Sequence, residues 1–288
     1  MKTDHKGEKI LPLLRATLGT LLEHKIILFP FFIIAAIQFF ILEILYFFPR
    51  YPLNVIFGPL VRKLWSEQFL HYPYNFTLLP KLFQYCQMPV YILVSSFFIA
   101  VGVNILSKIN EDSKFTLKSV FAQTLTAYVH VFMSALLSFC LVFVFFKAYG
   151  LVYERAMQIR SVQGPFYMIK LIAINAAPYL NMLWSVFVTT LMAYMIPIIV
   201  IKQKKFFAAL VMNFKFLQGS FWKTFFIIMF PSLLFLPVMW LRNIFTIDLF
   251  APEFAIVTLV ISIIVSVFID ALVYSALTIR YIWKAEEK

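Results

Sequence analysis

The stretch "LPLLRATLGTLLEHKIILFPFFIIAAIQFFILEILYFF", residues 11–48, joins two kinds of sequence without a break. Its first half spaces leucines among charged and polar residues, and its second half is almost wholly apolar apart from Glu43. A helix needs about 20 apolar residues to cross a bilayer core. The second half is long enough to do so, and it is too long for the core of a signal peptide. We therefore expect it to stay in the protein as a first membrane span.

Composition extends this conclusion to the whole chain. Of the 288 residues, 62% are hydrophobic and 13% are charged, whereas soluble domains are close to half apolar and a quarter charged. Six segments are apolar over a membrane-spanning length, namely residues 26–48, 85–106, 127–147, 179–201, 223–241 and 255–279. The predicted fold class is all-α, as a single integral membrane domain over residues 1–288.

The fourth span has open boundaries. Residues 166–201 are apolar, but Pro178 and the polar residues Asn175 and Asn181 interrupt them. One interpretation is a short interfacial helix at about 166–176 followed by the span. The other is one long helix kinked at the proline.

Basic residues give a prediction of topology. The net charge is +12, and the lysines and arginines gather beside apolar runs, where they contact anionic headgroups and orient the chain. We therefore predict a lipid bilayer as the partner and no nucleic acid. If the N-terminus, the second and fourth loops and the C-terminus share one side, that side carries sixteen of the 25 basic residues. This distribution predicts that both termini are cytoplasmic.

Three amphipathic segments, here called the lead-in helices, precede the first, third and fifth spans. They cover residues 10–22, 117–129 and 206–217, and each shows the 3.6-residue apolar period of a helix. The expected apolar face of the first contains Ile10, Leu11, Leu14, Leu18, Leu21 and Leu22, with Arg15, Thr17 and Thr20 opposite. In the third, the face contains Phe206, Phe207, Leu210, Phe214 and Leu217.

The lead-in helices suggest a three-fold pseudo-repeat of hairpins. Each unit would contain a cytoplasmic lead-in helix, a span outward, an outer loop and a span back. The lead-in helices either pack under the bundle or bind lipid headgroups or a membrane-protein partner. A further interfacial helix is expected on the outer side, within residues 54–70.

Two short stretches carry a family resemblance. "LLEHKIILFPFFIIAAI" (21–37) and "ALVMNFKFLQGSFWKTFFI" (209–227) each run from a helix with charged residues into a span. They resemble uncharacterised bacterial six-span membrane protein families. The layout is also similar to the membrane domain fused to some glycerophosphodiester phosphodiesterases. The resemblance implies an all-helical protein of the bacterial inner membrane, the cytoplasmic membrane, and it carries over no catalytic residues.

Motifs of soluble enzymes are absent from the sequence. It has no phosphate-binding G-x-x-x-x-G-K-[ST] loop, no H-E-x-x-H and no G-x-S-x-G, and its four histidines lie far apart. The two cysteines, Cys86 and Cys140, lie in apolar runs, where a thiol acts as a small hydrophobe. We predict no catalytic residue, no cofactor and no metal ion, and a protein that is not an enzyme.

Polar residues at membrane depth are the candidate functional residues, because they are costly there and often functional. Asp270 lies near the middle of the last span, and Ser262, Ser266 and Asp270 are four residues apart on one helix face. This stripe is expected to face the bundle interior. Asp270 either takes part in a proton or substrate pathway or forms hydrogen bonds that fix packing.

Three further polar residues complete the candidates. Glu43 and Lys147 lie at the outer ends of the first and third spans, at a similar depth. They either pair with one another or reach the interface separately. His130 lies one turn before Ser134 in the third span, where packing or hydrogen bonding is expected rather than ligand binding.

Two function classes follow. The leading hypothesis is a membrane-organising or transport-accessory protein that uses its lead-in helices. The alternative is a transporter or channel subunit for a lipid-like or small hydrophobic solute, with Asp270 in the pathway. A polar cavity that reaches Asp270 would favour the alternative, and a stripe sealed by neighbouring helices would favour the first.

Overall fold

The computed structural model describes residues 9–158, 165–247 and 253–286, and this part of the chain is all-α, without strands. The α-helices are α1 (Ile10–Glu23), α2 (Phe29–Tyr46), α3 (Leu53–Leu64), α4 (Tyr74–Val90), α5 (Ser96–Asn110), α6 (Leu117–Met157), α7 (Pro165–Leu191), α8 (Met195–Ile201), α9 (Phe206–Leu217), α10 (Phe221–Ser232), α11 (Leu236–Ile247) and α12 (Phe254–Glu286). A π-helical turn at Tyr91–Ser95 joins α4 to α5, and a 3₁₀ turn at Leu233–Phe235 joins α10 to α11.

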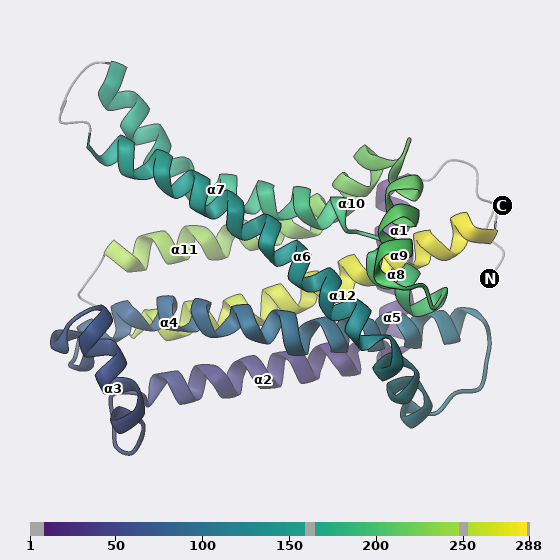
Figure 1. Cartoon of the computed structure of the whole chain (residues 1–288), viewed down its shortest axis with the longest axis horizontal. Helices are drawn as coiled ribbons and strands as arrows, with labels where there is room; N and C mark the ends of the chain where they lie inside the picture. The colour runs from purple at the N-terminus through teal and green to yellow at the C-terminus, as the bar shows by residue number, and fades with distance from the viewer. Residues whose placement is uncertain (1–8, 159–164, 248–252, 287–288) are drawn as a thin grey trace.

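Six helical segments of the described chain are long and apolar enough to cross a membrane, which confirms the predicted fold class. They are Lys25–Tyr46, Tyr74–Asn110, Leu117–Met157, Tyr179–Ile201, Phe221–Leu241 and Phe254–Ala285. The second and third extend beyond the predicted limits, because hydropathy marks the apolar part of a helix and not its ends. Figure 1 shows α1 at the same end of the bundle as the C-terminal half of α12, with α3 at the opposite end.

The fourth span departs from the preferred interpretation. No separate interfacial helix covers residues 166–176, because α7 runs unbroken from Pro165 to Leu191. Water is not available in a bilayer to pair with backbone groups freed by a break, so a continuous helix that includes Pro178 is favoured. The chain breaks instead after Leu191, and a short turn leads into α8.

The second lead-in helix is also not a separate element. It forms the first turns of α6, which is 41 residues long and begins with a capping box between Thr116 and Ser119. The first and third lead-in helices are separate, as α1 and α9. The interfacial helix expected within residues 54–70 is present as α3.

Only part of the expected apolar face of the first lead-in helix turns towards the bundle. α1 buries Leu13, Thr17 and Leu21 against the bundle, whereas Leu11 and Leu22 are 71% and 63% exposed. In a membrane both the bundle and the lipid are apolar, so an apolar face does not have to turn inward. Helices approach one another more closely through small and polar side chains, which places the face containing Thr17 inward.

All three lead-in helices bury a polar side chain at the same position. Thr17, Thr124 and Asn213 each lie eight residues after the helix N-cap, and each is 0% exposed. Thr17 and Thr124 donate hydrogen bonds to the backbone oxygen four residues earlier. Thr124 also accepts a bond of 3.1 Å from Nδ2 of Asn104 on α5. The three units therefore place a buried polar side chain at the same position of the lead-in helix.

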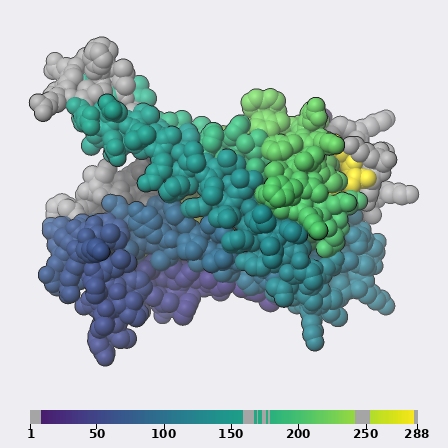
Figure 2. Space-filling model, in the orientation of Figure 1, coloured from purple at the N-terminus to yellow at the C-terminus, as the bar shows by residue number. Residues whose placement is uncertain are grey.

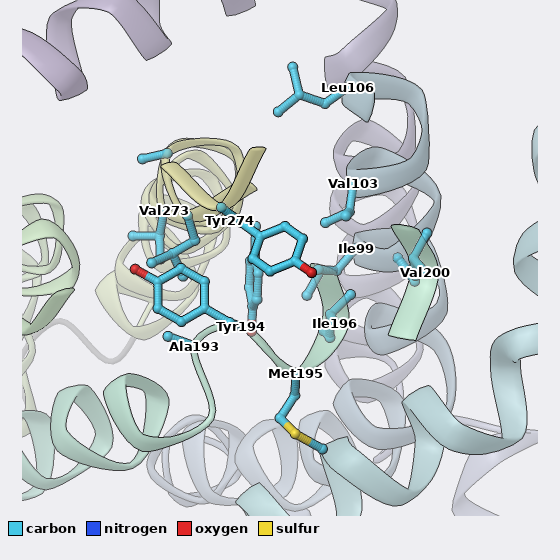
Figure 3. Close-up of a cluster of buried hydrophobic side chains, with 14 of the residues drawn as sticks. Ile99, Val103, Leu106, Ala193, Tyr194, Met195, Ile196, Val200, Val273 and Tyr274 are labelled. Carbon is cyan, nitrogen blue, oxygen red and sulfur yellow. The ribbon is translucent and has the colours of Figure 1, made fainter. Parts of the chain in front are cut away.

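The units close into a ring. Each span that returns to the α1 end packs against the lead-in helix of the next unit, α5 on α6, α8 on α9 and α12 on α1. The side chains of these returning helices belong to one buried cluster, in which Val103, Ile196 and Val273 come from three different units (Figure 3). The buried core therefore includes the ends of the hairpins that carry the lead-in helices.

Asn213 ties the third lead-in helix to the break between α7 and α8. Its side-chain oxygen accepts a bond of 3.0 Å from the N–H of Tyr194, and its Nδ2 donates to the oxygen of Leu191 at 2.7 Å. Both backbone groups lose their helical partners where the chain turns. Asn213 therefore supplies the hydrogen bonds that this break needs.

We expect Asn213→Leu to lower the free energy of unfolding by about 2 kcal/mol, because two buried backbone groups lose their partners. The measurement is thermal or denaturant unfolding of the purified protein in detergent. The matched control is Phe207→Leu, which changes an exposed side chain on the same helix. Equal stability of the two variants would contradict the role given to Asn213.

Candidate functional site

A cavity of about 270 Å³ lies beside Asp270 at the middle of the last span. Helices of all three units form its walls, because Tyr91 comes from the second span, α7 and α10 contribute further residues, and α12 contributes five. The residues that line it are Tyr91, Met182, Ser185, Val186, Thr189, Ile228, Ser232, Phe235, Ser266, Ile269, Asp270, Val273 and Tyr274. Its volume is slightly below the roughly 300–1,000 Å³ of drug-sized ligand sites.

Seven of the lining side chains carry hydroxyl or carboxyl groups, and two of the serines have their protons engaged elsewhere. Ser232 donates to the backbone oxygen of Ile228 at 2.8 Å, and Ser266 donates to that of Ile263 at 3.0 Å. A hydroxyl that donates in this way presents only lone pairs to the cavity. These two serines therefore offer acceptors to the cavity, whereas the hydroxyls of Ser185 and Thr189 can also donate.

Asp270 has no cationic partner in the part of the chain that the structure describes. The ion pairs there are Arg62 with Glu67 and Lys108 with Glu111, both away from the cavity. The described residues that line the cavity include no lysine, arginine or histidine. The carboxyl group therefore faces the cavity with hydroxyl groups and apolar side chains around it.

Two tyrosines separate this cavity from a second one. The hydroxyls of Tyr91 and Tyr274 lie 3.2 Å apart and form a hydrogen bond. Both residues also line a smaller cavity of about 30 Å³, together with Ser96, Ser134 and Ser138. Tyr91 begins the π-helical turn, and such turns are frequent at functional sites. The Tyr91–Tyr274 pair thus closes the inner boundary of the larger cavity.

α12 is closely packed from this pair towards the α1 end. Every residue of α12 from Ala271 to Tyr281 is buried. Arg280 is 1% exposed and donates from Nη1 to the hydroxyls of Tyr194 at 3.0 Å and Thr224 at 2.8 Å. These bonds join α12 to the α7–α8 turn and to α10. We call this packed part of the bundle, around residues 271–281, the plug.

The α6–α7 pair diverges from α4 towards the end that carries α3 (Figure 1), and the end of this pair projects from the surface (Figure 2). Stacking of Phe145 on Trp184, with ring centroids 4.6 Å apart, holds α6 and α7 together. At the α3 end, a side-chain hydrogen bond to Glu253 raises the pKa of Tyr72 and links the loop before α4 to the start of α12.

The structure brings together two of the predicted site residues. Ser266 and Asp270 both line the cavity, as their shared helix face requires. Ser262, one turn earlier, is not among the residues that line it and donates to the oxygen of Thr258 at 2.6 Å. The predicted stripe therefore enters the site only at its C-terminal end.

Glu43, Lys147 and His130 lie away from this cavity. Glu43 and Lys147 are both exposed, and the described residues show no ion pair between them. Lys147 lies over the ring of Phe143, 5.5 Å from its centroid, which fits separate positions near the interface. Nδ1 of His130 is buried and has no hydrogen-bond partner among the described residues.

Sequence reasoning missed most of the cavity wall. Tyr274 is predictable from the sequence, because it continues the four-residue spacing of Ser262, Ser266 and Asp270. Tyr91, Ser185 and Ser232 carry no such pattern and meet only through packing. Arg280 was assigned to the basic residues that orient the chain, whereas the structure buries it. Among the described residues, no group of three or more histidine, cysteine or acidic side chains could hold a metal ion.

These features define the chain as a polytopic membrane protein with six membrane-spanning helical segments and an intramembrane polar cavity. Comparison with family models, with curated proteins and with solved structures finds no match. The class therefore rests on the helices themselves, and the resemblance to bacterial six-span families stays a prediction.

We expect a cysteine at position 266 to react with a small water-soluble thiol reagent at least about tenfold faster than one at position 275, because a sealed residue reacts only after local opening. The variants are Ser266→Cys and Ser275→Cys, two serines on α12 of which Ser275 is buried outside the cavity. Both are made after replacement of Cys86 and Cys140 by alanine. Equal labelling rates in liposomes would contradict an accessible cavity.

Proposed function

We propose that this chain is a non-enzymatic transport protein that binds a small amphipathic, lipid-like solute in the cavity beside Asp270. The observation that carries the proposal is a polar cavity at membrane depth, reached by the carboxyl group of Asp270. A buried carboxyl group without a cation is costly in a bilayer. A binding site for a polar group of the ligand explains why the carboxyl group of Asp270 lies there.

A second cavity of the molecule serves as an internal comparison. A groove of about 280 Å³ lies between α2 and the other face of α12, and it is lined by apolar residues alone. They are Leu28, Phe31, Phe32, Ala35, Phe39, Ile264, Val267, Phe268 and Ala271. The two faces of α12 therefore differ, because one lines an apolar groove and the other contributes Ser266, Asp270 and Tyr274 to a polar wall.

The arrangement of the plug fits a carrier that opens on one side at a time. The inner half is closed by the returning spans and by the bonds of Arg280, and the cavity lies above that half. In this proposal the termini are cytoplasmic, as the basic residues predict, and the protein resides in the cytoplasmic membrane. The cavity then communicates with the outer half of the bilayer.

A second candidate function is the organisation of the membrane through the lead-in helices. Its support is that their exposed faces are apolar, with Leu11, Leu22, Phe207 and Val211 all exposed. Lysines at 202, 204, 205 and 215 flank the third of these helices. Such helices lie among lipid headgroups or against a membrane-protein partner. This role and solute transport are compatible in one molecule.

The transport proposal is tested with three radiolabelled probes that share a cyclohexylmethyl tail and carry an alcohol, an amine or a carboxylate. Uptake is measured into proteoliposomes preloaded with the same unlabelled probe, against protein-free liposomes. We expect at least one probe to exchange faster with the protein present. Asp270→Leu should reduce that exchange about tenfold or more, since a polar contact to a charged group is worth roughly 1.5–3 kcal/mol.

The matched control is Glu43→Gln, which removes a carboxyl group from a span but not from the cavity. Its exchange rate should equal that of the wild type. Elution of each variant from a size-exclusion column as a single peak shows that it is folded. If no probe exchanges faster than in protein-free liposomes, or if Asp270→Leu retains full exchange, the proposal is wrong.

A further inference from the structure

Within the proposed function, the chemistry of the cavity wall specifies the ligand more narrowly. We infer that the cavity takes a primary ammonium group, with an apolar remainder attached to it. The argument rests on the charge at the wall, on the balance of hydrogen-bond donors and acceptors, and on the volume.

The ionisable group of the wall is acidic. Asp270 is the ionisable acid among the described lining residues, and no basic residue lies among them. The tyrosine hydroxyls at positions 91 and 274 lie within electrostatic reach of its carboxyl group. A cation that enters would form an ion pair with Asp270 and remove an uncompensated charge from the bilayer interior. An anionic ligand would meet a carboxylate with no cation beside it.

The acceptors of the wall suit N–H groups on the ligand. Ser232 and Ser266 donate their protons to backbone oxygens, and in the Tyr91–Tyr274 pair one hydroxyl donates to the other. The hydroxyls of Ser185 and Thr189 also line the cavity and can both donate and accept. A primary ammonium has three donors and no acceptor. Its N–H groups can therefore donate to the carboxyl group of Asp270 and to hydroxyl oxygens, whereas a quaternary ammonium has no N–H to donate.

Apolar residues accommodate the rest of the ligand. Met182, Val186, Ile228 and Val273 line the same cavity, and the ring of Phe235 adds an aromatic surface. Aromatic faces also attract cations when water is excluded. A volume of about 270 Å³ holds a headgroup or a small amine and not a whole lipid. The ammonium can belong to a free amphipathic amine or to a lipid headgroup.

The test compares four probes on the full-length protein in nanodiscs of phosphatidylglycerol, by equilibrium binding. They are cyclohexylmethylamine, cyclohexylmethanol, cyclohexylacetate and cyclohexylmethyl-trimethylammonium. We expect the amine to bind at least about tenfold more tightly than the alcohol or the quaternary cation, because a charge-assisted hydrogen bond is worth a factor of that size. Asp270→Asn should reduce the preference for amine over alcohol to less than about threefold.

Each outcome decides a different point. Equal binding of amine and alcohol by the wild type overturns the ammonium inference and leaves solute binding intact. Equal binding of the quaternary cation and the amine overturns the part based on N–H donors. Binding of no probe overturns the proposed function itself. The ratio of amine to alcohol affinity is measured on the wild-type protein, so the test remains even if Asp270→Asn does not fold. The control variant Glu43→Gln should keep the full preference for the amine over the alcohol.

The same binding measurement distinguishes the two sources of the ammonium. Nanodiscs that contain phosphatidylethanolamine carry a lipid with a primary ammonium. If that headgroup is the natural occupant, it should compete and weaken the apparent affinity for cyclohexylmethylamine about tenfold. An unchanged affinity assigns the site to a free amphipathic amine.

Discussion

The absence of water inside a bilayer is the constraint on which this structure depends, because backbone polar groups there need partners within the protein. The constraint keeps α7 continuous past Pro178 and moves the chain break to a place where Asn213 pairs the freed backbone groups. It also explains why the buried threonines of the lead-in helices bond to their own helices. Polar residues are thus tolerated wherever the fold gives them a hydrogen bond.

The three-unit arrangement follows from the same constraint together with helix packing. A hairpin of two apolar helices has no hydrophobic reason to associate with another in lipid, so close contact has to come from small and polar side chains. Each unit buries a polar side chain at the same position of its lead-in helix. Because each returning span packs on the next lead-in helix, the contacts form a closed ring at the α1 end. The Tyr91–Tyr274 pair lies between this end and the cavity beside Asp270.

Sequence alone predicted the six spans and the helical lead-in segments, because membrane length and helical period are local properties. It did not predict which face of α1 packs inward, since hydropathy does not distinguish a lipid contact from a protein contact. It placed Ser266 and Asp270 on one face, and the same spacing leads to Tyr274. Tyr91, Ser185 and Ser232 join the site through the arrangement of three helices, which no single helix encodes.

Arg280 and Asp270 show two environments for an ionisable residue on the same helix. They are buried or half-buried and lie ten residues apart, or about 15 Å along the helix axis. Arg280 is held by packing, because it donates to hydroxyl groups of Tyr194 and Thr224 at 3.0 and 2.8 Å. Asp270 instead lines a cavity, where Ser232 and Ser266 donate to the backbone of their own helices and not to its carboxyl group. This difference is the reason for proposing a ligand-binding role for Asp270 and a structural role for Arg280.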